Sequence, residues 1–464
     1  MTSSNEQAAD AANAALLADP FGPLRTKGYL MLLVIAAVLG VVLSAGAYGF
    51  LQLVDKFQHA VYTDLPQGLG FRSTPTWWPL PLLAVAGVLV ALTVQYLPGN
   101  GGHQPAEGLK THGGTATGRE LPGILIAALL SLGLGAVIGP EAPLISLGGG
   151  LALYAFRLLK PDADARTQAV VAASGSFAAI SALLGSPLLG AFLLMEASGL
   201  GGPMLGIVLL PGLLASGVGS LIFTGLGSFT GVSAGSLVIP SLPPVDRPDI
   251  AQFGWALAIG VAAALLGTAI HRLALGLQPR VNRRRLLMTP LMGLVTAGVA
   301  IAYVEGTGHP LTDVLFSGQS DLPQLLLHAG DYTAGALTLL VACKGIGYVV
   351  CLAAFRGGPI FPALFVGAAG GIAVSHLPGL PFVTGAAMGM GALVVAMLRL
   401  PMTSVLLATL LLGADGVTVM PLVIVAVVVC HVTASRLNRP APVPAPTPGP
   451  VTDPGGGSVG TAAT

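Results

Sequence analysis

The stretch Gly139-Pro140-Glu141-Ala142-Pro143 has a counterpart further along the chain, Gly358-Pro359-Ile360-Phe361-Pro362. Each stretch reaches a further glycine nine residues after its first one, at Gly148 and at Gly367. Proline is favoured in the first turn of a helix, where its missing N–H would have no partner in any case. Both stretches therefore predict a helix that begins directly after a tight glycine turn.

The two stretches belong to a longer internal repeat. Gly175 stands twelve residues before Pro187, and Gly389 stands twelve residues before Pro401, so a second proline-started segment follows each copy in the same order. Two halves of this kind are typical of ion transporters with inverted-topology repeats, whose broken helices meet at the membrane midplane. We expect an all-α polytopic membrane protein with these segments: a polar cytoplasmic segment 1–27, a first helical repeat 28–226, a connecting loop 227–247, a second helical repeat 248–437, and a disordered Pro/Gly-rich tail 438–464.

Composition supports a membrane protein. Charged residues occupy 8% of the 464 positions, whereas a soluble domain carries about 25%. The net charge of +1 gives no basic surface for a nucleic-acid partner. Apolar stretches near or above the ~18 residues of a membrane helix occur at 28–54, 76–97, 122–138, 204–226, 250–277, 286–303, 333–355 and 418–434. Shorter apolar pieces, broken by glycine and proline, lie at 139–159, 168–184, 186–199, 358–377, 383–398 and 401–413.

The basic residues predict how the chain is oriented in the bilayer. Arg25 and Lys27 precede the first span, four arginines lie within 280–285, and Arg436 and Arg439 follow the last span. Cytoplasmic loops carry the excess of Lys and Arg. We therefore expect a multi-pass protein of the cell membrane with both termini in the cytoplasm.

The repeated helix starts indicate an anion site. The first turn of a helix has unpaired N–H groups and about half a positive charge, so converging starts bind an anion without a lysine. Glu141 stands in the first copy where the second has Ile360. A carboxylate at such a start can occupy the anion site itself and leave it when protonated or displaced, which makes Glu141 a candidate gate. The alternative is a capping carboxylate that satisfies local N–H groups.

Other ionisable residues in apolar segments leave two interpretations open. Glu196 is either a structural partner, with Lys344 as one candidate, or part of a proton path, and Lys344 is expected in a structural salt bridge. Arg356 and Arg399 are expected to lie at head-group level, with backbone carbonyls near an inner vestibule as an alternative for Arg399. The only enzyme-like pattern, G-x-S-x-G at 231–235, lies in a Ser/Gly-rich loop without a preceding strand, so we expect no enzyme.

These motifs together resemble the CLC chloride channel and transporter family. Residues 139–143 are similar to its G-R-E-G-P motif, and 357–362 to its G-G-x-F-x-P motif. The segment 184–196 resembles its N-A-P-L-A-G helix, which ends in paired glutamates. The most specific match is 389–403, which resembles G-M-G-A-L…R-x-P-x-T.

The resemblance implies a homodimer that transports a small chloride-like anion, with one pathway in each subunit. It implies that Glu141 is the gate and that backbone N–H groups at the helix starts hold the anion. The corresponding anion-binding residues here are Gly101, Gly139, Ala142, Ile360 and Phe361. Neither a cofactor nor a metal is implied.

The chain also departs from the family pattern. The family's anion-binding serine falls near Gly101, and its tyrosine falls on Gly416 beside Asp415. The second glutamate of the family's pair is Ala197 here. We therefore keep Glu196, Lys344 and Asp415 as proton-path or structural residues, and leave channel or anion/proton exchanger open. The alternatives are a cation- or proton-coupled secondary transporter of another class, and an intramembrane enzyme or scaffold.

Overall fold

The structure is a computed structural model that describes residues 19, 22–108, 116–198, 203–230, 238–239, 242–245 and 247–438. The predicted tail beyond Asn438, about half of the predicted connecting loop and the G-x-S-x-G pattern lie outside these residues. Throughout the described part the regular structure is helical, with one isolated β-bridge.

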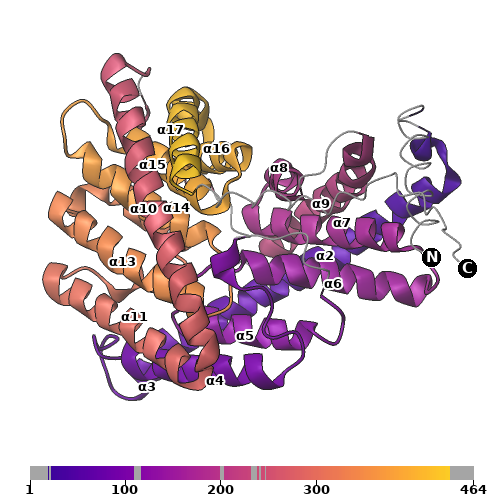
Figure 1. Ribbon diagram of the computed structural model, residues 1–464, viewed down its shortest axis with the longest axis horizontal. Helices are drawn as coiled ribbons and strands as arrows, with labels where there is room; N and C mark the ends of the chain where they lie inside the picture. The colour runs from indigo at the N-terminus through magenta and orange to yellow at the C-terminus, as the bar shows by residue number, and fades with distance from the viewer. Residues whose placement is uncertain are drawn as a thin grey trace, which may run out of the picture.

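The helices of the first half, in chain order, are α2 (Lys27–His59), α3 (Leu65–Gly68), α4 (Pro79–Tyr96), α5 (Leu121–Gly133), α6 (Glu141–Leu159), α7 (Ala165–Leu184), α8 (Pro187–Ser198) and α9 (Pro203–Thr230). Those of the second half are α10 (Ile250–Arg283), α11 (Arg285–Thr307), α12 (Leu322–Leu327), α13 (Ala334–Ala354), α14 (Ile360–Ser375), α15 (Phe382–Leu398), α16 (Pro401–Leu411) and α17 (Gly416–Leu437). Figure 1 shows α10, α11 and α13–α17 gathered on one side and α2 with α5–α9 on the other. Helix α4 crosses from the first half and packs against α11.

Eight helical segments in the described residues are long and apolar enough to cross a membrane: Lys27–Gly68, Pro79–Tyr96, Glu141–Leu159, Thr167–Leu184, Ile250–Arg283, Arg285–Thr307, Ala334–Ala354 and Gly413–Leu437. One predicted span was wrong. The stretch 122–138 is the short helix α5 followed by irregular backbone, whereas 204–226 lies within the 28-residue helix α9. Conversely, α6 and most of α7 reach membrane length although the sequence predicted shorter pieces there.

The four glycines singled out by spacing pair in the same way in both halves. A side chain at Gly148 would overlap the carbonyl oxygen of Gly175, so α6 and α7 cross in backbone contact. A side chain at Gly367 would likewise overlap the carbonyl oxygen of Gly389, where α14 crosses α15. Close approach of backbones at small residues is how membrane helices pack. The sequence repeat thus corresponds to a structural repeat.

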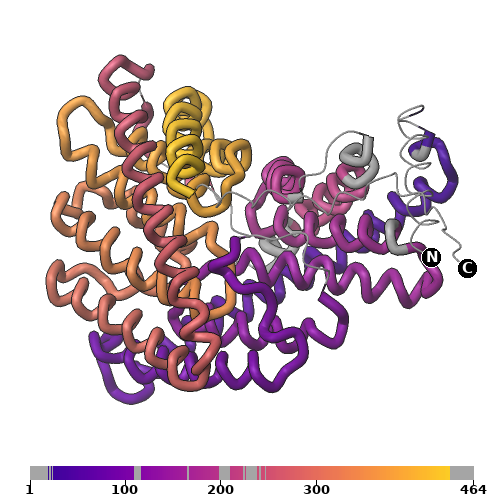
Figure 2. Tube along the Cα trace, viewed as in Figure 1, coloured from indigo at the N-terminus to yellow at the C-terminus, as the bar shows by residue number. Residues whose placement is uncertain are grey.

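The two halves meet at the β-bridge. The N–H of Gly139 donates to the carbonyl oxygen of Gly358 at 2.7 Å, and the N–H of Gly358 donates back to Gly139 at 2.6 Å. Figure 2 shows the magenta trace of the first half and the orange trace of the second half coming together near the middle of the molecule. This reciprocal pair sets the beginning of α6 beside the beginning of α14.

Candidate functional site

The carboxylate of Glu141 lies at the junction between the halves. Glu141 is the first residue of α6 and is fully buried. Its Oε1 accepts a hydrogen bond of 2.8 Å from the N–H of Phe361, the second residue of α14. The N–H groups in the first turn of a helix have no intrahelical acceptor and carry partial positive charge. A side chain from one half therefore occupies the helix start of the other half.

Two glycines make room for this carboxylate. A side chain at Gly358 would overlap Oε2 of Glu141, and a side chain at Gly139 would overlap both carboxylate oxygens. Oε2 itself has no hydrogen-bond partner in the described part of the chain, although it is buried. A buried carboxylate oxygen without a donor is costly. The side chain is thus held in place at one oxygen only.

Helix α13 supports both backbone segments that lead into the site. The Tyr348 hydroxyl donates to the carbonyl oxygen of Pro359 at 2.6 Å. One turn later, the Cys351 sulfur accepts from the N–H of Val137 at 3.3 Å. Sequence reasoning missed both residues. The only indication in the sequence is that Tyr348 and Cys351, two residues with a polar side-chain atom, stand three residues apart in an apolar helix.

The five predicted anion-binding residues do not all lie at one site. Ile360 and Phe361 are buried at the start of α14 beside Glu141. Ala142 is half-buried in the first turn of α6. Gly139 requires a correction, because its N–H is already paired with Gly358 and is not available to an anion. Gly101 lies with a left-handed φ of +69° in the loop before 105–107, where it packs against Arg356.

Arg356 also requires a correction, because it does not lie at head-group level. Only 3% of the residue is exposed. Its backbone N–H donates to the hydroxyl of Ser131 at 3.2 Å, and its Nε donates to the carbonyl oxygen of Asn100 at 3.4 Å. Arg399, in contrast, is exposed and ends α15 in a left-handed conformation with φ of +61°.

Glu196 and Lys344 do not pair with each other, contrary to one expectation. Glu196 accepts from the N–H of Met402 at 2.8 Å and from the N–H and hydroxyl of Thr403 at 2.7 and 2.6 Å, so it caps the start of α16. The Lys344 ammonium instead donates to the carbonyl oxygens of Asp313, Val314 and Leu315 at 2.8, 3.2 and 3.1 Å. The expected salt bridge of Lys344 was wrong, and backbone carbonyls, which also serve as partners of charged groups in membrane spans, take its place.

Asp415 and Gly416 stand at the junction of α16 and α17. Asp415 ends the short 3-10 turn Gly413–Asp415 and is half-buried. Gly416 packs against the backbone of Thr409 in α16. No contact in the described part joins Asp415 to Glu141.

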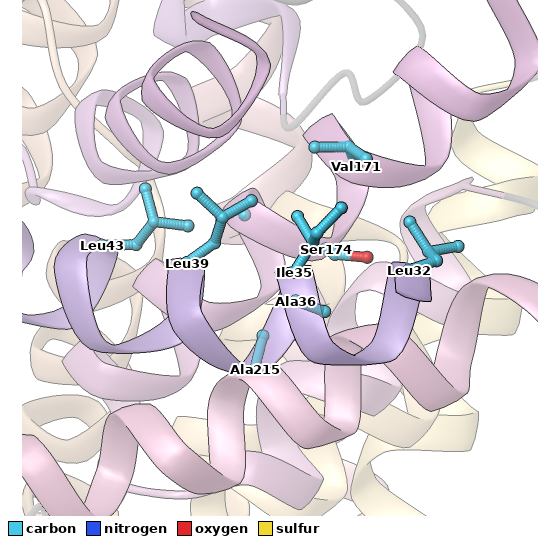
Figure 3. A pocket seen from close by; sticks show the side chains of 9 residues that line it. Leu32, Ile35, Ala36, Leu39, Leu43, Val171, Ser174 and Ala215 are labelled. Carbon is cyan, nitrogen blue, oxygen red and sulfur yellow. The ribbon is translucent and has the colours of Figure 1, made fainter. Parts of the chain in front are cut away.

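A separate pocket lies between α2, α7 and α9 (Figure 3). Its lining is apolar apart from Ser174, whose hydroxyl donates to the carbonyl oxygen of Val170. The pocket offers an ion no free polar group, so it is not a second candidate for the site.

Comparison with known proteins agrees with this architecture. The profile of the family described as "Voltage gated chloride channel" matches residues 82–435. The protein named "Putative ion-transport protein YfeO" of Salmonella choleraesuis (strain SC-B67) is 30% identical over 366 residues, covering 77% of this chain and 84% of its own length.

Solved structures show the same fold. A slow cyanobacterial Cl−/H+ antiporter matches with a TM-score of 0.71 at 21% identity, over 88% of this chain and 95% of its own. A CLC-type fluoride/proton antiporter matches with a TM-score of 0.62 at 17% identity, over 89% of this chain and 97% of its own. These matches confirm the expected all-α, inverted-repeat fold. The chain therefore belongs to the voltage-gated chloride channel (CLC) family, and it is a multi-pass membrane protein of ion transport and not an enzyme.

Proposed function

We propose that this protein moves a chloride-like inorganic anion across the membrane and that Glu141 is its gate. The observation that carries the proposal is the 2.8 Å hydrogen bond from the N–H of Phe361 to Glu141. The carboxylate is itself an anion bound at a helix start. A permeating anion would need the same donor.

Competition for one donor explains how the gate works. While the carboxylate is charged and in place, the start of α14 is filled. Protonation removes its charge and weakens its hold on the N–H group, because hydrogen bonds to ionised acceptors are about twice as strong as neutral ones. A high anion concentration displaces it by mass action. Flux should therefore rise at low pH and at high anion concentration.

The contacts of Glu196 favour a structural role over proton exchange. Both oxygens of Glu196 accept hydrogen bonds from the start of α16, and its neighbour is Ala197. We assign Glu196 a capping role. Any proton coupling would then use Glu141 and a route that does not require Glu196 to titrate, whereas a channel would require no such route.

The proposal also covers the assembly of the protein and its orientation in the membrane. We propose a homodimer in the plasma membrane, with one pathway per subunit and both termini in the cytoplasm. The domain limits 28–226 and 248–437 are likewise proposed, supported by the paired crossings at Gly148 and Gly367.

The test is anion efflux from liposomes that contain the purified protein, measured across a pH series. Glu141→Gln keeps the size of the side chain but removes its titration, so its flux should lose the dependence on pH that the wild-type protein shows. Glu305→Gln, at an exposed position in α11, is the matched control and should behave like the wild type. Equal pH dependence in Glu141→Gln and wild type would refute the gate.

A further inference from the structure

One face of α13 contacts main-chain atoms on both sides of the bridge between the halves. The polar side chains on this face stand four and three residues apart, as neighbours on a helix do, and all are fully buried: Lys344, Tyr348 and Cys351. Tyr348 donates to the carbonyl oxygen of Pro359, directly before α14. Cys351 accepts from the N–H of Val137, shortly before α6. Helix α13 therefore fixes the two helix starts relative to each other.

Of these side chains, Tyr348 has the most direct connection with Glu141. Its hydroxyl donates at 2.6 Å to the carbonyl oxygen of the peptide whose N–H belongs to Ile360, the first residue of α14. That N–H lies within electrostatic reach of the Glu141 carboxylate. A hydrogen bond to the carbonyl of a peptide also polarises its N–H, because the two groups share one conjugated unit. Tyr348 thus increases the positive charge that Glu141 meets at the start of α14.

Tyr348 is also the one ionisable side chain in the described residues that interacts electrostatically with Glu141. Helices α2, α5 and α7, which pack against α6, and α14 across the bridge present no other such group to the carboxylate within the described part. The cation on the same face of α13, Lys344, interacts instead with Asp313 and Asp321. The titration of Glu141 therefore depends on the helix starts and on Tyr348.

We propose that Tyr348 is a positioning residue of the gate and sets the pH at which Glu141 releases the start of α14. Tyr348 acts through the Pro359–Ile360 peptide and does not touch the transported ion. Without its hydroxyl, the N–H of Ile360 is a weaker donor and the charged carboxylate is less favoured, so protonation takes place at a higher pH. The inference rests on the proposed function and deepens it, because it assigns control of the gate to a side chain outside both helix starts.

The experiment measures anion flux from liposomes across a pH series for Tyr348→Phe, which removes the hydroxyl and keeps the ring. Cooperative polarisation strengthens a hydrogen bond by about 10–30%, which for a bond to a carboxylate corresponds to about 0.3 pH unit. The pH of half-maximal flux should therefore rise by about 0.3 unit, which is about a twofold change in proton concentration.

Tyr303→Phe is the matched control. Tyr303 is also fully buried, and its hydroxyl donates to Asp313 at 2.9 Å. No contact in the described part joins Tyr303 to Glu141. Tyr303→Phe should therefore leave the pH of half-maximal flux unchanged, although it too removes a buried hydrogen bond.

A pH of half-maximal flux in Tyr348→Phe that equals or lies below that of wild type would overturn the proposal. An equal rise in Tyr303→Phe would also overturn it, because a general loss of stability would then explain the shift. The double variant Glu141→Gln/Tyr348→Phe should show flux as insensitive to pH as Glu141→Gln alone. A pH dependence that appears only in the double variant would show that Tyr348 acts on another group.

An infrared titration of the purified protein separates this inference from the proposed function. The protonated carboxyl group of Glu141 gives a C=O band that Glu141→Gln removes, so its protonation is followed without any transport. If the wild-type protein carries no anion flux, or if its flux does not depend on Glu141, the proposed function fails. A higher infrared midpoint in Tyr348→Phe would still support the coupling of Tyr348 to Glu141, and an unchanged midpoint would refute it.

Discussion

Removing the Glu141 side chain should tighten anion binding at the start of α14. The carboxylate makes one hydrogen bond there, 2.8 Å from the N–H of Phe361. A hydrogen bond to a charged group contributes about 1.5–3 kcal/mol. An anion that displaces the side chain must break this hydrogen bond, which costs about 2 kcal/mol of its binding free energy. Because about 1.4 kcal/mol corresponds to a factor of ten, Glu141→Ala should lower the Kd for the transported anion about 30-fold.

The assay is calorimetric titration of chloride into purified protein, in a buffer whose only other anion is too large to enter the site. Glu141→Gln should fall between Glu141→Ala and wild type, because its amide oxygen still accepts from Phe361 but carries no charge. Glu305→Ala is the control, because Glu305 is an exposed carboxylate of α11. A Kd for Glu141→Ala within about threefold of wild type would refute direct competition for this helix start.

Three further substitutions test other parts of the account. Glu196→Gln should cost about 1 kcal/mol of stability through the weakened cap of α16 and leave anion flux intact; loss of proton movement at unchanged unfolding temperature would instead place Glu196 on a proton path. Gly358→Ala should displace the Glu141 carboxylate and make flux insensitive to pH. The control Gly330→Ala, where a side chain meets open space, should leave the pH dependence of flux unchanged. If Gly358→Ala keeps the pH dependence of the wild type, the Glu141 carboxylate does not need the space at Gly358. Lys344→Met should leave three buried carbonyls without their donor and lower the free energy of unfolding by about 3 kcal/mol; an unchanged unfolding temperature would show that water replaces the ammonium.

The repeat and its helix starts could be predicted from the sequence because close backbone contact leaves a signature. Only glycine fits at the crossings of α6 with α7 and of α14 with α15, so Gly148 and Gly367 recur at the same spacing from their helix starts. Proline marks the first turn of a helix for the same kind of steric reason. These two constraints located both halves and placed Glu141 at a helix start.

Contacts between distant parts of the chain could not be predicted in this way. Lys344 finds backbone carbonyls, and every residue carries a carbonyl, so no sequence pattern announces that partner. Glu196 caps a helix that begins in the other half of the chain. Arg356 follows an apolar helix, as a residue at a membrane interface does, and only the packing of the loop 99–102 shows that it is buried.

The sequence also could not predict where the helix within 122–138 ends. The predicted stretch 122–138 is apolar throughout, yet α5 ends at Gly133 and the chain continues through Gly135, which has a φ of +105°. The irregular backbone that follows leads to the bridge at Gly139 and is buried in protein. An apolar segment buried in this way cannot be distinguished from a membrane helix by its sequence, because a continuous apolar run has no periodicity that indicates the backbone conformation.

The central claim is that the permeating ion is an anion, and ion replacement in liposomes tests it most directly. Flux through the wild-type protein is recorded while chloride is replaced by a large impermeant anion, and separately while sodium or potassium is replaced by a large organic cation, with internal pH followed throughout. If the permeating ion is an anion, flux should disappear when chloride is replaced and should not change when the cation is replaced. Flux that follows sodium or potassium and persists without chloride would contradict it and favour a cation-coupled transporter built on the same intramembrane carboxylates.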